Sequence, residues 1–196
     1  MNLPNKLTVL RIALAFIFVP LLFINGLFAK ISAFLIFIAA SVTDLLDGYF
    51  AKKNNQVTDF GKLMDPVADK ILVLSAFLAF VEMGLVPAWM VVVIIFREAA
   101  VTGLRILALT KGRVISADLA GKHKTVSQVL AIALILLLLI FREAGSGNLS
   151  FWSAGTETAY RDLVFAVMLI TVTLTLISGV SYLIKNREVY SSAKKS

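Results

Sequence analysis

Apolar runs of roughly membrane-spanning length recur along almost the whole chain, and only short polar segments separate them. A transmembrane helix needs about 20 mainly apolar residues, because the hydrocarbon core of a bilayer is about 30 Å thick. Backbone polar groups inside that core must be satisfied within the segment, which favours helices. We therefore expect an all-α integral membrane bundle of six transmembrane helices, folded as a single domain over residues 1–196, with spans at residues 7–28, 31–50, 65–83, 86–109, 126–141 and 163–184.

The composition supports a membrane protein and narrows its chemistry. Hydrophobic residues make up 59% of the chain, and its mean hydropathy is +0.91, whereas soluble domains contain about 45–50% apolar residues. The chain has no cysteine, which excludes disulfides, thiolate metal ligands and a cysteine nucleophile. Its net charge of +7 indicates membrane orientation and affinity for anionic lipid rather than for nucleic acid.

Basic residues are distributed unevenly between the two sides of the predicted membrane. One side carries three, Lys30, Arg142 and Arg161, whereas the other side carries fourteen. Lysine and arginine concentrate in cytoplasmic loops, so we expect a multi-pass protein of the cell membrane with both termini in the cytoplasm. The polar loops after the second and fourth spans would lie on the same side, beside a polar cavity that opens to the cytoplasm.

Four aspartates lie where the second predicted span ends and the third begins. Asp44 and Asp47 are three residues apart, and Asp65 and Asp69 are four apart, so each pair shares one face of a helix. We expect the third helix to begin at Asp65, with this aspartate as the N-cap and Pro66 at the first helical position. If the two helices are antiparallel, the two acid pairs face each other.

Acids this close to a bilayer core need compensation. An ionised aspartate there costs several kcal/mol without a partner, and four of them repel one another, so the cluster requires cations, protonation or water. Carboxylate oxygens without histidine or cysteine beside them suit Mg²⁺, Mn²⁺ or Ca²⁺ rather than zinc or copper. Two such ions would suit phosphoryl chemistry.

Residues 44–69 resemble the signature of the CDP-alcohol phosphotransferases, membrane enzymes that displace CMP from a CDP-linked lipid or alcohol with a hydroxyl acceptor. The resemblance implies one or two Mg²⁺ or Mn²⁺ ions held by the four aspartates, with Asp69 also acting as the general base. Lys52 stands where the family usually has arginine; it keeps the positive charge but lacks the bidentate fork of a guanidinium. The matching positions are Asp44, Asp47, Gly48, Ala51, Gly61, Asp65 and Asp69, and the implied CDP-binding residues are Gly48, Ala51, Lys52 and Gly61.

A group of basic residues follows the acids. Arg97 and Arg105 lie eight residues apart, close to two helical turns, so they share one face of the fourth predicted span. Arginines inside a membrane face a bundle interior or a watery cavity, and together with Arg113 and Lys122 they could bind a phosphate. The alternatives are that Arg97 pairs with a nearby acid and that Lys122 only helps to set the orientation of the protein in the membrane. We expect Lys124 to be a solvated charge.

Residues 3–11, 97–105 and 121–125 resemble the bacterial branch of that family whose acceptor is glycerol 3-phosphate. The resemblance implies transfer of a phosphatidyl group from CDP-diacylglycerol to this acceptor, whose phosphate would be held by the two arginines of residues 97–105, by Arg113 and by Lys122. It also implies a homodimer. Inositol phosphate, serine or phosphatidylglycerol are alternative acceptors. A small cation transporter is the rival class, but transport favours acids near mid-membrane and matching halves, which this sequence lacks.

Overall fold

The computed structural model describes residues 3–53, 59–112, 119–146 and 152–191, and these form helices joined by short turns. For residues 3–5, 44–53, 59–66, 69, 119–123 and 191 the description covers the backbone only. The described ranges confirm the all-α expectation. The helices are α1 (Leu3–Phe23), α2 (Leu27–Lys53), α3 (Asp59–Glu82), α4 (Ala88–Thr110), α5 (Leu119–Ser146), α6 (Ala154–Lys185) and α7 (Arg187–Ser191).

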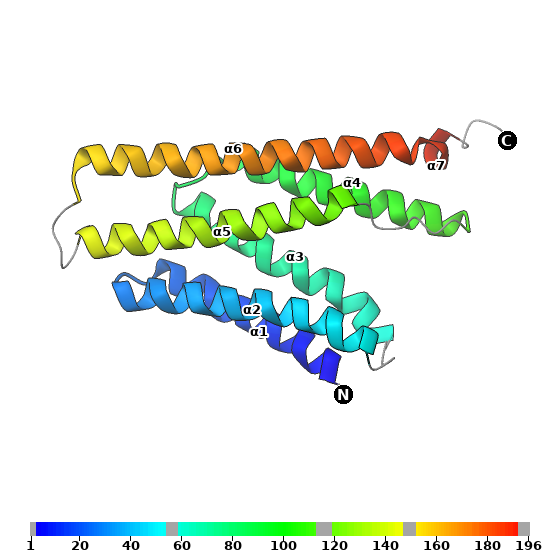
Figure 1. Ribbon diagram of the computed structural model, residues 1–196, viewed down its shortest axis with the longest axis horizontal. Helices are drawn as coiled ribbons and strands as arrows, with labels where there is room; N and C mark the ends of the chain where they lie inside the picture. Colours follow the sequence, from blue (N-terminus) through cyan, green and yellow to red (C-terminus); the bar gives the residue numbers. More distant parts are fainter. Residues whose placement is uncertain (1–2, 54–58, 113–118, 147–151, 192–196) are drawn as a thin grey trace.

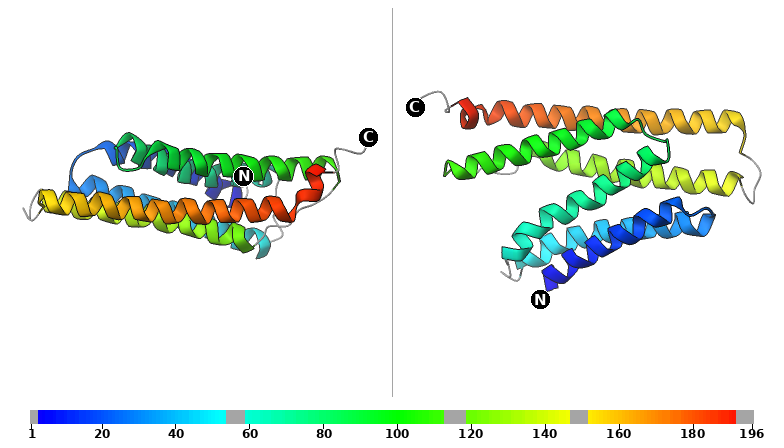
Figure 2. Two further views of the ribbon diagram at one scale, coloured as in Figure 1. Left: turned by 90° about the horizontal axis from the view of Figure 1, so that it is seen from above. Right: turned by 180° about the vertical axis from the view of Figure 1, so that it is seen from behind.

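The long helices run back and forth along the long axis of an elongated bundle (Figures 1 and 2). α1 packs against α2 and α3, α4 packs against α6, and α5 joins the two groups through contacts with α2, α3 and α6. We call the end where α2 and α4 finish and α3 and α5 begin the signature end, and the other end the opposite end. α1 begins and α7 ends at the signature end as well (Figure 1).

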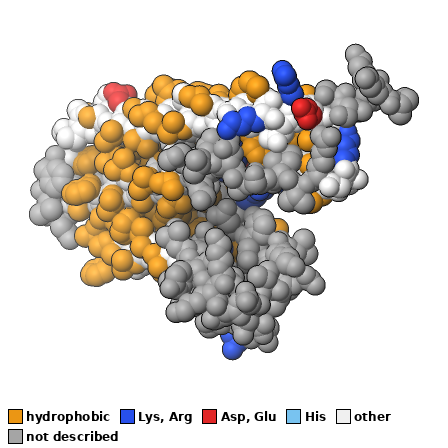
Figure 3. Space-filling view, turned by 45° about the vertical axis from the view of Figure 1, so that its right-hand side comes forward, with side chains coloured by type: hydrophobic (Ala, Val, Ile, Leu, Met, Phe, Trp, Pro, Cys, Tyr) orange, Lys and Arg blue, Asp and Glu red, His pale blue; other side chains and the backbone are white. Residues whose placement is uncertain are grey.

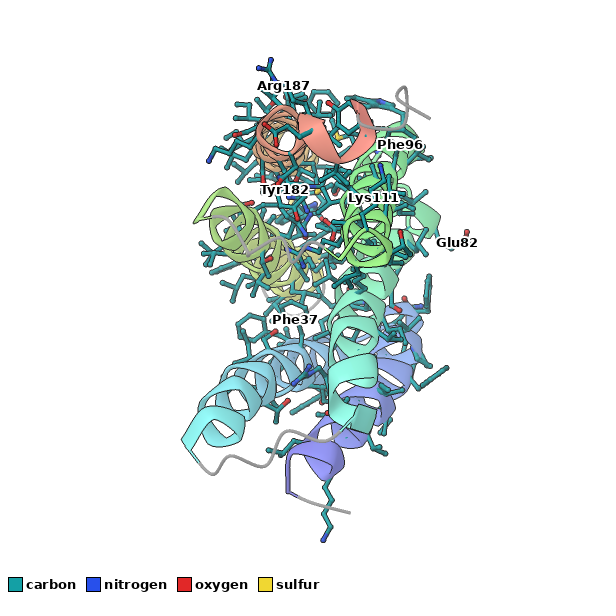
Figure 4. All side chains as sticks on the ribbon, turned by 90° about the vertical axis from the view of Figure 1, so that its right-hand side faces the viewer. Phe37, Glu82, Phe96, Lys111, Tyr182 and Arg187 are labelled. Atoms are coloured by element: carbon teal, nitrogen blue, oxygen red, sulfur yellow. The ribbon has the colours of Figure 1, made fainter. Side chains whose placement is uncertain are left out.

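Buried residues spaced three or four apart hold the helices together, as expected for a period of 3.6 residues. In the larger core, the rings of Phe18 on α1 and Phe37 on α2 lie with their centroids 5.8 Å apart. Tyr182 belongs to a smaller cluster between α4 and α6 (Figure 4). The buried stripe on α4 comprises Val91, Ile94, Arg97, Val101, Leu104 and Ala108, and that on α6 includes Tyr160, Val164, Met168, Thr171, Thr175, Ser178 and Tyr182.

Each of the six predicted apolar segments lies largely within one of α1 to α6. Among the side chains that the structure describes, three helices are long and apolar enough to cross a membrane, namely Lys6–Phe23, Lys124–Ser146 and Ala154–Lys185, and Leu27–Thr43 is a shorter apolar helix. Many large hydrophobic side chains are exposed and form a broad surface over the left part of the molecule in Figure 3. Such a surface suits helices that face lipid, so the fold is that of a helical membrane protein.

The boundary between the first two helices differs from the prediction. We expected the first span to reach residue 28, but α1 ends at Phe23 and α2 begins at Leu27. Gly26 causes the reversal, because its φ of 112° lies in a region that glycine adopts without a steric penalty. The apolar run continues through this turn, so hydropathy alone could not locate it.

The starts of α3, α5 and α6 were also predicted too late along the chain, and α6 begins at Ala154 rather than at residue 163. α3 begins at Asp59 rather than at Asp65, so Asp65 is not an N-cap and Pro66 lies inside the helix. An acid at residue 59 suits the positive end of the helix dipole, and Pro66 costs a single backbone hydrogen bond close to the helix start. α5 begins at Leu119, so Lys122 and Lys124 belong to a helix and not to a polar loop.

Ion pairs and hydrogen bonds close the opposite end of the bundle. Glu157 on α6 accepts hydrogen bonds from Arg142 Nε at 2.9 Å, Arg161 Nε at 3.0 Å and Trp152 Nε1 at 3.0 Å. Glu143 on α5 accepts one from the backbone N–H of Gly26 at 2.6 Å. The connections α1–α2 and α5–α6 are therefore each tied to a neighbouring helix.

Lys30 at the start of α2 completes the turn after α1. Its side chain is only 5% exposed, and its ammonium donates hydrogen bonds to the carbonyl oxygens of Leu22 at 2.6 Å and Ile24 at 3.0 Å. Carbonyl groups at the end of a helix have no partner within the helix, so the lysine satisfies acceptors that would otherwise lie unpaired in apolar surroundings.

Replacing Lys30 with methionine should therefore destabilise the bundle without changing its shape. Lys30→Met keeps the apolar stem and removes the two charge-assisted hydrogen bonds, each worth about 1.5–3 kcal/mol. We expect a lower midpoint of thermal unfolding in detergent, followed by tryptophan fluorescence. The control is Lys6→Met, which removes an exposed lysine on α1 and should leave the midpoint unchanged; equal midpoints for both variants would contradict the capping role.

Candidate functional site

The backbone brings both pairs of aspartates to the signature end. Asp44 and Asp47 lie in the later turns of α2, and Asp65 and Asp69 lie in the first turns of α3. The two helices run in opposite directions and meet at this end (Figure 1), so the antiparallel arrangement that we considered is present in the backbone. The side chains of all four aspartates, and those of Gly48, Ala51, Lys52 and Gly61 on the same helices, lie outside the described residues.

The chemistry of these donors fits a hard divalent cation. Carboxylates are the ligands that Mg²⁺ and Mn²⁺ prefer, and the chain path carries four of them to one end of the bundle. Among the side chains that the structure describes, no group of three or more His, Cys, Asp or Glu could hold a metal ion. The four aspartates at the signature end are therefore the candidate metal ligands.

A buried arginine lies on the helix that packs against both acid-bearing helices. Arg11 on α1 is only 1% exposed, and Thr8, one turn earlier, is fully buried. Because α1 contacts α2 and α3, the guanidinium brings a positive charge into the part of the bundle that carries the acids.

Arg97 and Arg105 share a face of α4, as their spacing predicts, and that face contacts α6. Arg97 Nη2 donates a hydrogen bond to Ser178 Oγ at 2.8 Å, and Arg105 Nε donates one to the hydroxyl of Tyr182 at 3.2 Å. The guanidinium of Arg105 also lies 5.7 Å from the centre of the Tyr182 ring. Arg97 is only 8% exposed, whereas the side chain of Arg105 is exposed. Arg105 is therefore accessible from the surface, and Arg97 is not.

Arg97 is confined by contacts with its own helix and with α6. Its Nη1 lies 3.2 Å from Glu98 Oε1, so the pairing with a nearby acid that we considered as an alternative is present. Within the part of the chain that the structure describes, its Nε has no hydrogen-bond acceptor. Arg97 lies against the backbone of α6 at Gly179, where an added Cβ would come within 2.8 Å of Arg97 Cγ. A larger residue at position 179 would push this arginine away from Ser178.

A second polar face of α4 receives lysines from two other helices. Glu98 forms an ion pair with Lys124 of α5, and Thr102, one turn further along, accepts a hydrogen bond from Lys70 Nζ of α3 at 2.6 Å. Lys124 is only 7% exposed, so our expectation of a solvated charge was wrong. The reason is that α5 starts early enough to carry Lys124 into the bundle, where Glu98 compensates its charge.

These side chains border a small pocket between α3, α4 and α5. Its polar lining consists of Lys70, Glu98, Lys124, Thr125 and Gln128, and its apolar lining consists of Val73 and Leu74. Gln128 in turn donates a hydrogen bond to Thr175 of α6 at 3.4 Å. The pocket therefore lies between α3, which carries Asp69, and the helices α4 and α5, which carry the basic residues.

Sequence reasoning overlooked Glu98, Lys70, Thr102 and Gln128 as parts of this site. One signal was available, because Glu98 and Thr102 are four residues apart and so share a face beside the arginine face. The partners of that face come from helices far apart in the sequence, and no local pattern identifies them. Of the other predicted acceptor residues, Arg113 lies outside the described residues, and Lys122 lies on α5 with its side chain outside them.

The comparisons with known proteins agree on one family. The model of the CDP-alcohol phosphatidyltransferase family matches residues 1–177. A CDP-diacylglycerol–glycerol-3-phosphate 3-phosphatidyltransferase of Bacillus subtilis is 41% identical over 98% of this chain and 98% of its own. A protein of the same name from Rickettsia bellii is 39% identical over 92% of this chain and 93% of its own. A probable phosphatidylglycerophosphate synthase of Mycobacterium tuberculosis H37Rv is 37% identical, over 92% and 79% respectively.

The close approach of Arg97 to Gly179 yields a prediction about stability. In Gly179→Ala the new methyl group would overlap the stem of Arg97, and overpacking of this kind costs about 1–3 kcal/mol. We expect a lower thermal unfolding midpoint in detergent than for the unchanged chain. Gly155→Ala, on the same helix, is the matched control, since its nearest neighbour would lie at 3.8 Å. A Gly179→Ala midpoint equal to that of the control would show that Arg97 is not confined there.

Proposed function

We propose that this chain, which belongs to the CDP-alcohol phosphatidyltransferase family, transfers the phosphatidyl group of CDP-diacylglycerol to sn-glycerol 3-phosphate. The products would be phosphatidylglycerophosphate and CMP. Relatives that cover almost the whole chain carry the name of this activity. One structural observation carries the proposal: the helices that bear the four aspartates lie beside the helices α4 and α5, which bear basic residues. The aspartates suit a metal-bound diphosphate, and the basic residues suit an anionic acceptor.

Asp44, Asp47, Asp65 and Asp69 would hold one or two Mg²⁺ or Mn²⁺ ions. When bound, such ions neutralise a diphosphate and stabilise the departing CMP. The donor chemistry and the chain path to one end support this assignment.

The remaining signature residues would bind the nucleotide and activate the acceptor. Gly48, Ala51 and Gly61, with the charge of Lys52, would line the CDP pocket, where small residues permit close approach. Asp69 would take the proton of the acceptor hydroxyl while the hydroxyl oxygen forms a bond to the phosphorus of the phosphatidyl group. The bond from that phosphorus to the oxygen of CMP would break, and CMP would leave.

The acceptor phosphate would be bound by basic residues of α4 and of the segment that follows. Arg105 is exposed, and among the described residues its partner is Tyr182, which it would release to reach a ligand. Arg97 is buried against Ser178 and would contribute mainly as a fixed positive charge. Arg113 and Lys122 complete the proposed set.

The proposed topology has six membrane spans with the termini and the site on the cytoplasmic side, where CDP-activated precursors are available. Six long helices that alternate in direction and the excess of basic residues at the signature end support it. The substrate's acyl chains would lie in lipid, which avoids extracting them from the membrane. By family resemblance we also propose a homodimer.

The direct test incubates purified protein with CDP-diacylglycerol and Mg²⁺ or Mn²⁺ and measures CMP release with and without glycerol 3-phosphate. Release that requires both metal and glycerol 3-phosphate would support the reaction and the acceptor together. Release only with inositol phosphate, serine or phosphatidylglycerol would keep the family and change the acceptor. Absence of release with every acceptor, in folded protein, would favour the cation-transporter alternative.

The metal assignment predicts that Asp65→Asn abolishes transfer while the protein stays folded. The change removes one charged oxygen ligand and little volume, so activity should fall at least about a hundredfold. CMP release is the measurement, and Asp162→Asn, at an exposed position near the opposite end, is the control. Turnover of Asp65→Asn near that of the control would remove Asp65 from the metal site.

The acceptor assignment predicts that Arg105→Ala mainly raises the KM for glycerol 3-phosphate. Loss of a charge-assisted contact to the phosphate should raise KM about tenfold or more, with little change in the KM for CDP-diacylglycerol. Tyr182→Phe is the control, because it removes only the hydroxyl that Arg105 contacts. An unchanged KM in Arg105→Ala would exclude this arginine from the acceptor pocket.

A further inference from the structure

We propose that a groove at the opposite end of the bundle binds the headgroup of a zwitterionic phospholipid with a primary ammonium, phosphatidylethanolamine. Arg161 would bind the phosphate of this lipid, and Asp162 would accept hydrogen bonds from its ammonium. The groove and the four aspartates lie at different ends of the molecule, so the lipid site is separate from the proposed transfer reaction.

The groove lies between the turn that joins α3 to α4 and the early turns of α6. Residues 84–87 form one wall, and Arg161, Asp162 and Phe165 form the other. Its volume is about 430 Å³, within the range of about 300–1,000 Å³ that is usual for small-molecule sites. Because the groove is open to the surface, it can receive a headgroup whose acyl chains stay outside.

The wall formed by residues 84–87 is apolar and held in place by α3. The backbone N–H groups of Gly84, Leu85 and Val86 donate to carbonyl oxygens near the end of that helix, at 2.9–3.3 Å, and Pro87 has no N–H. These amide donors are therefore already used. The groups that can bind a charged ligand in this groove come from α6.

The charges beside the groove favour a ligand with two opposite charges. Arg161 Nε donates to Glu157 Oε1 at 3.0 Å, yet the arginine side chain remains 56% exposed, and the other nitrogens of its guanidinium fork can bind a phosphate. Glu157 also pairs with Arg142, so these three groups carry one net positive charge. Asp162, which is exposed, adds one negative charge. The four groups sum to zero, which suits a zwitterion.

The polarity of α6 along its axis matches that of a phospholipid. Phe165 lies one turn further along α6 than Arg161, and Leu169 lies one turn further again, so all three share a face. Both apolar side chains are exposed, on a helix long and apolar enough to cross a membrane. A lipid with its headgroup beside Arg161 would therefore lay its acyl chains along Phe165 and Leu169.

The carboxylate of Asp162 distinguishes between phospholipid headgroups. The ethanolamine nitrogen carries N–H groups that donate hydrogen bonds to a carboxylate. The choline nitrogen of phosphatidylcholine has the same charge but no N–H group. Phosphatidylglycerol has a net negative charge, which Asp162 would repel. The groove should therefore prefer phosphatidylethanolamine to both of the other lipids.

The experiment measures the binding of these three lipids, with identical acyl chains, to the full chain in detergent by mass spectrometry of the intact complexes. We expect phosphatidylethanolamine to bind about tenfold more tightly than the other two, roughly the effect of one charge-assisted hydrogen bond. Asp162→Asn should remove its preference over phosphatidylcholine. Arg161→Gln should weaken the binding of phosphatidylethanolamine and phosphatidylcholine alike, because both carry the same phosphate.

Two variants at the same end of the bundle are matched controls. Glu82→Gln removes another exposed carboxylate, which is labelled in Figure 4 and is not among the residues that line the groove. Arg142→Gln removes the other arginine that pairs with Glu157, again outside the groove lining. Both controls should keep the lipid preference of the unchanged chain, and thermal unfolding in detergent would show that every variant is folded.

Equal affinity of the unchanged chain for the three lipids would overturn the proposal. So would a preference for phosphatidylethanolamine that survives in Asp162→Asn, or a preference of the unchanged chain for phosphatidylglycerol. Failure of the proposed function would be visible separately, because CMP release by the unchanged chain reports on the transfer reaction and not on this groove.

Discussion

A charge among apolar helices must find a partner there, because the surrounding lipid cannot solvate it. The charged side chains that the structure describes inside the bundle follow this constraint. Lys30 lies on helix-end carbonyls, Arg97 lies between Ser178 and Glu98, and Lys124 lies on Glu98. Arg97, Glu98 and Lys124 link α4, α5 and α6, so contacts that help to hold these helices together also belong to the polar site.

The type of fold was predictable because hydropathy depends on composition within a window and not on distant contacts. The apolar runs predicted the long helices, and the eight-residue spacing of Arg97 and Arg105 predicted their common face. The positions of the helix ends were harder to predict. The turn at Gly26 interrupts an apolar run without changing its hydropathy, and the early start of α3 places Asp65 and Pro66 inside a helix.

The backbone arrangement of the site was predictable, whereas its side-chain contacts were not. The spacing of the aspartates predicted that the chain path would bring them together, and it does so at the signature end. Lys124 was misjudged, because its neighbours in the sequence are polar while its partner, Glu98, lies on another helix. Partners that meet only through packing leave no local pattern, and this explains why the pocket beside α3 was missed.

One oxygen of Glu98 contacts both Arg97 and Lys124, and this restricts the substitutions that the protein can tolerate during evolution. Loss of the carboxylate alone would leave two buried cations facing each other, and loss of either cation alone would alter the balance for the other. Residues 97, 98 and 124 are thus constrained as a set, and a neutral drift at one position requires a compensating exchange at another.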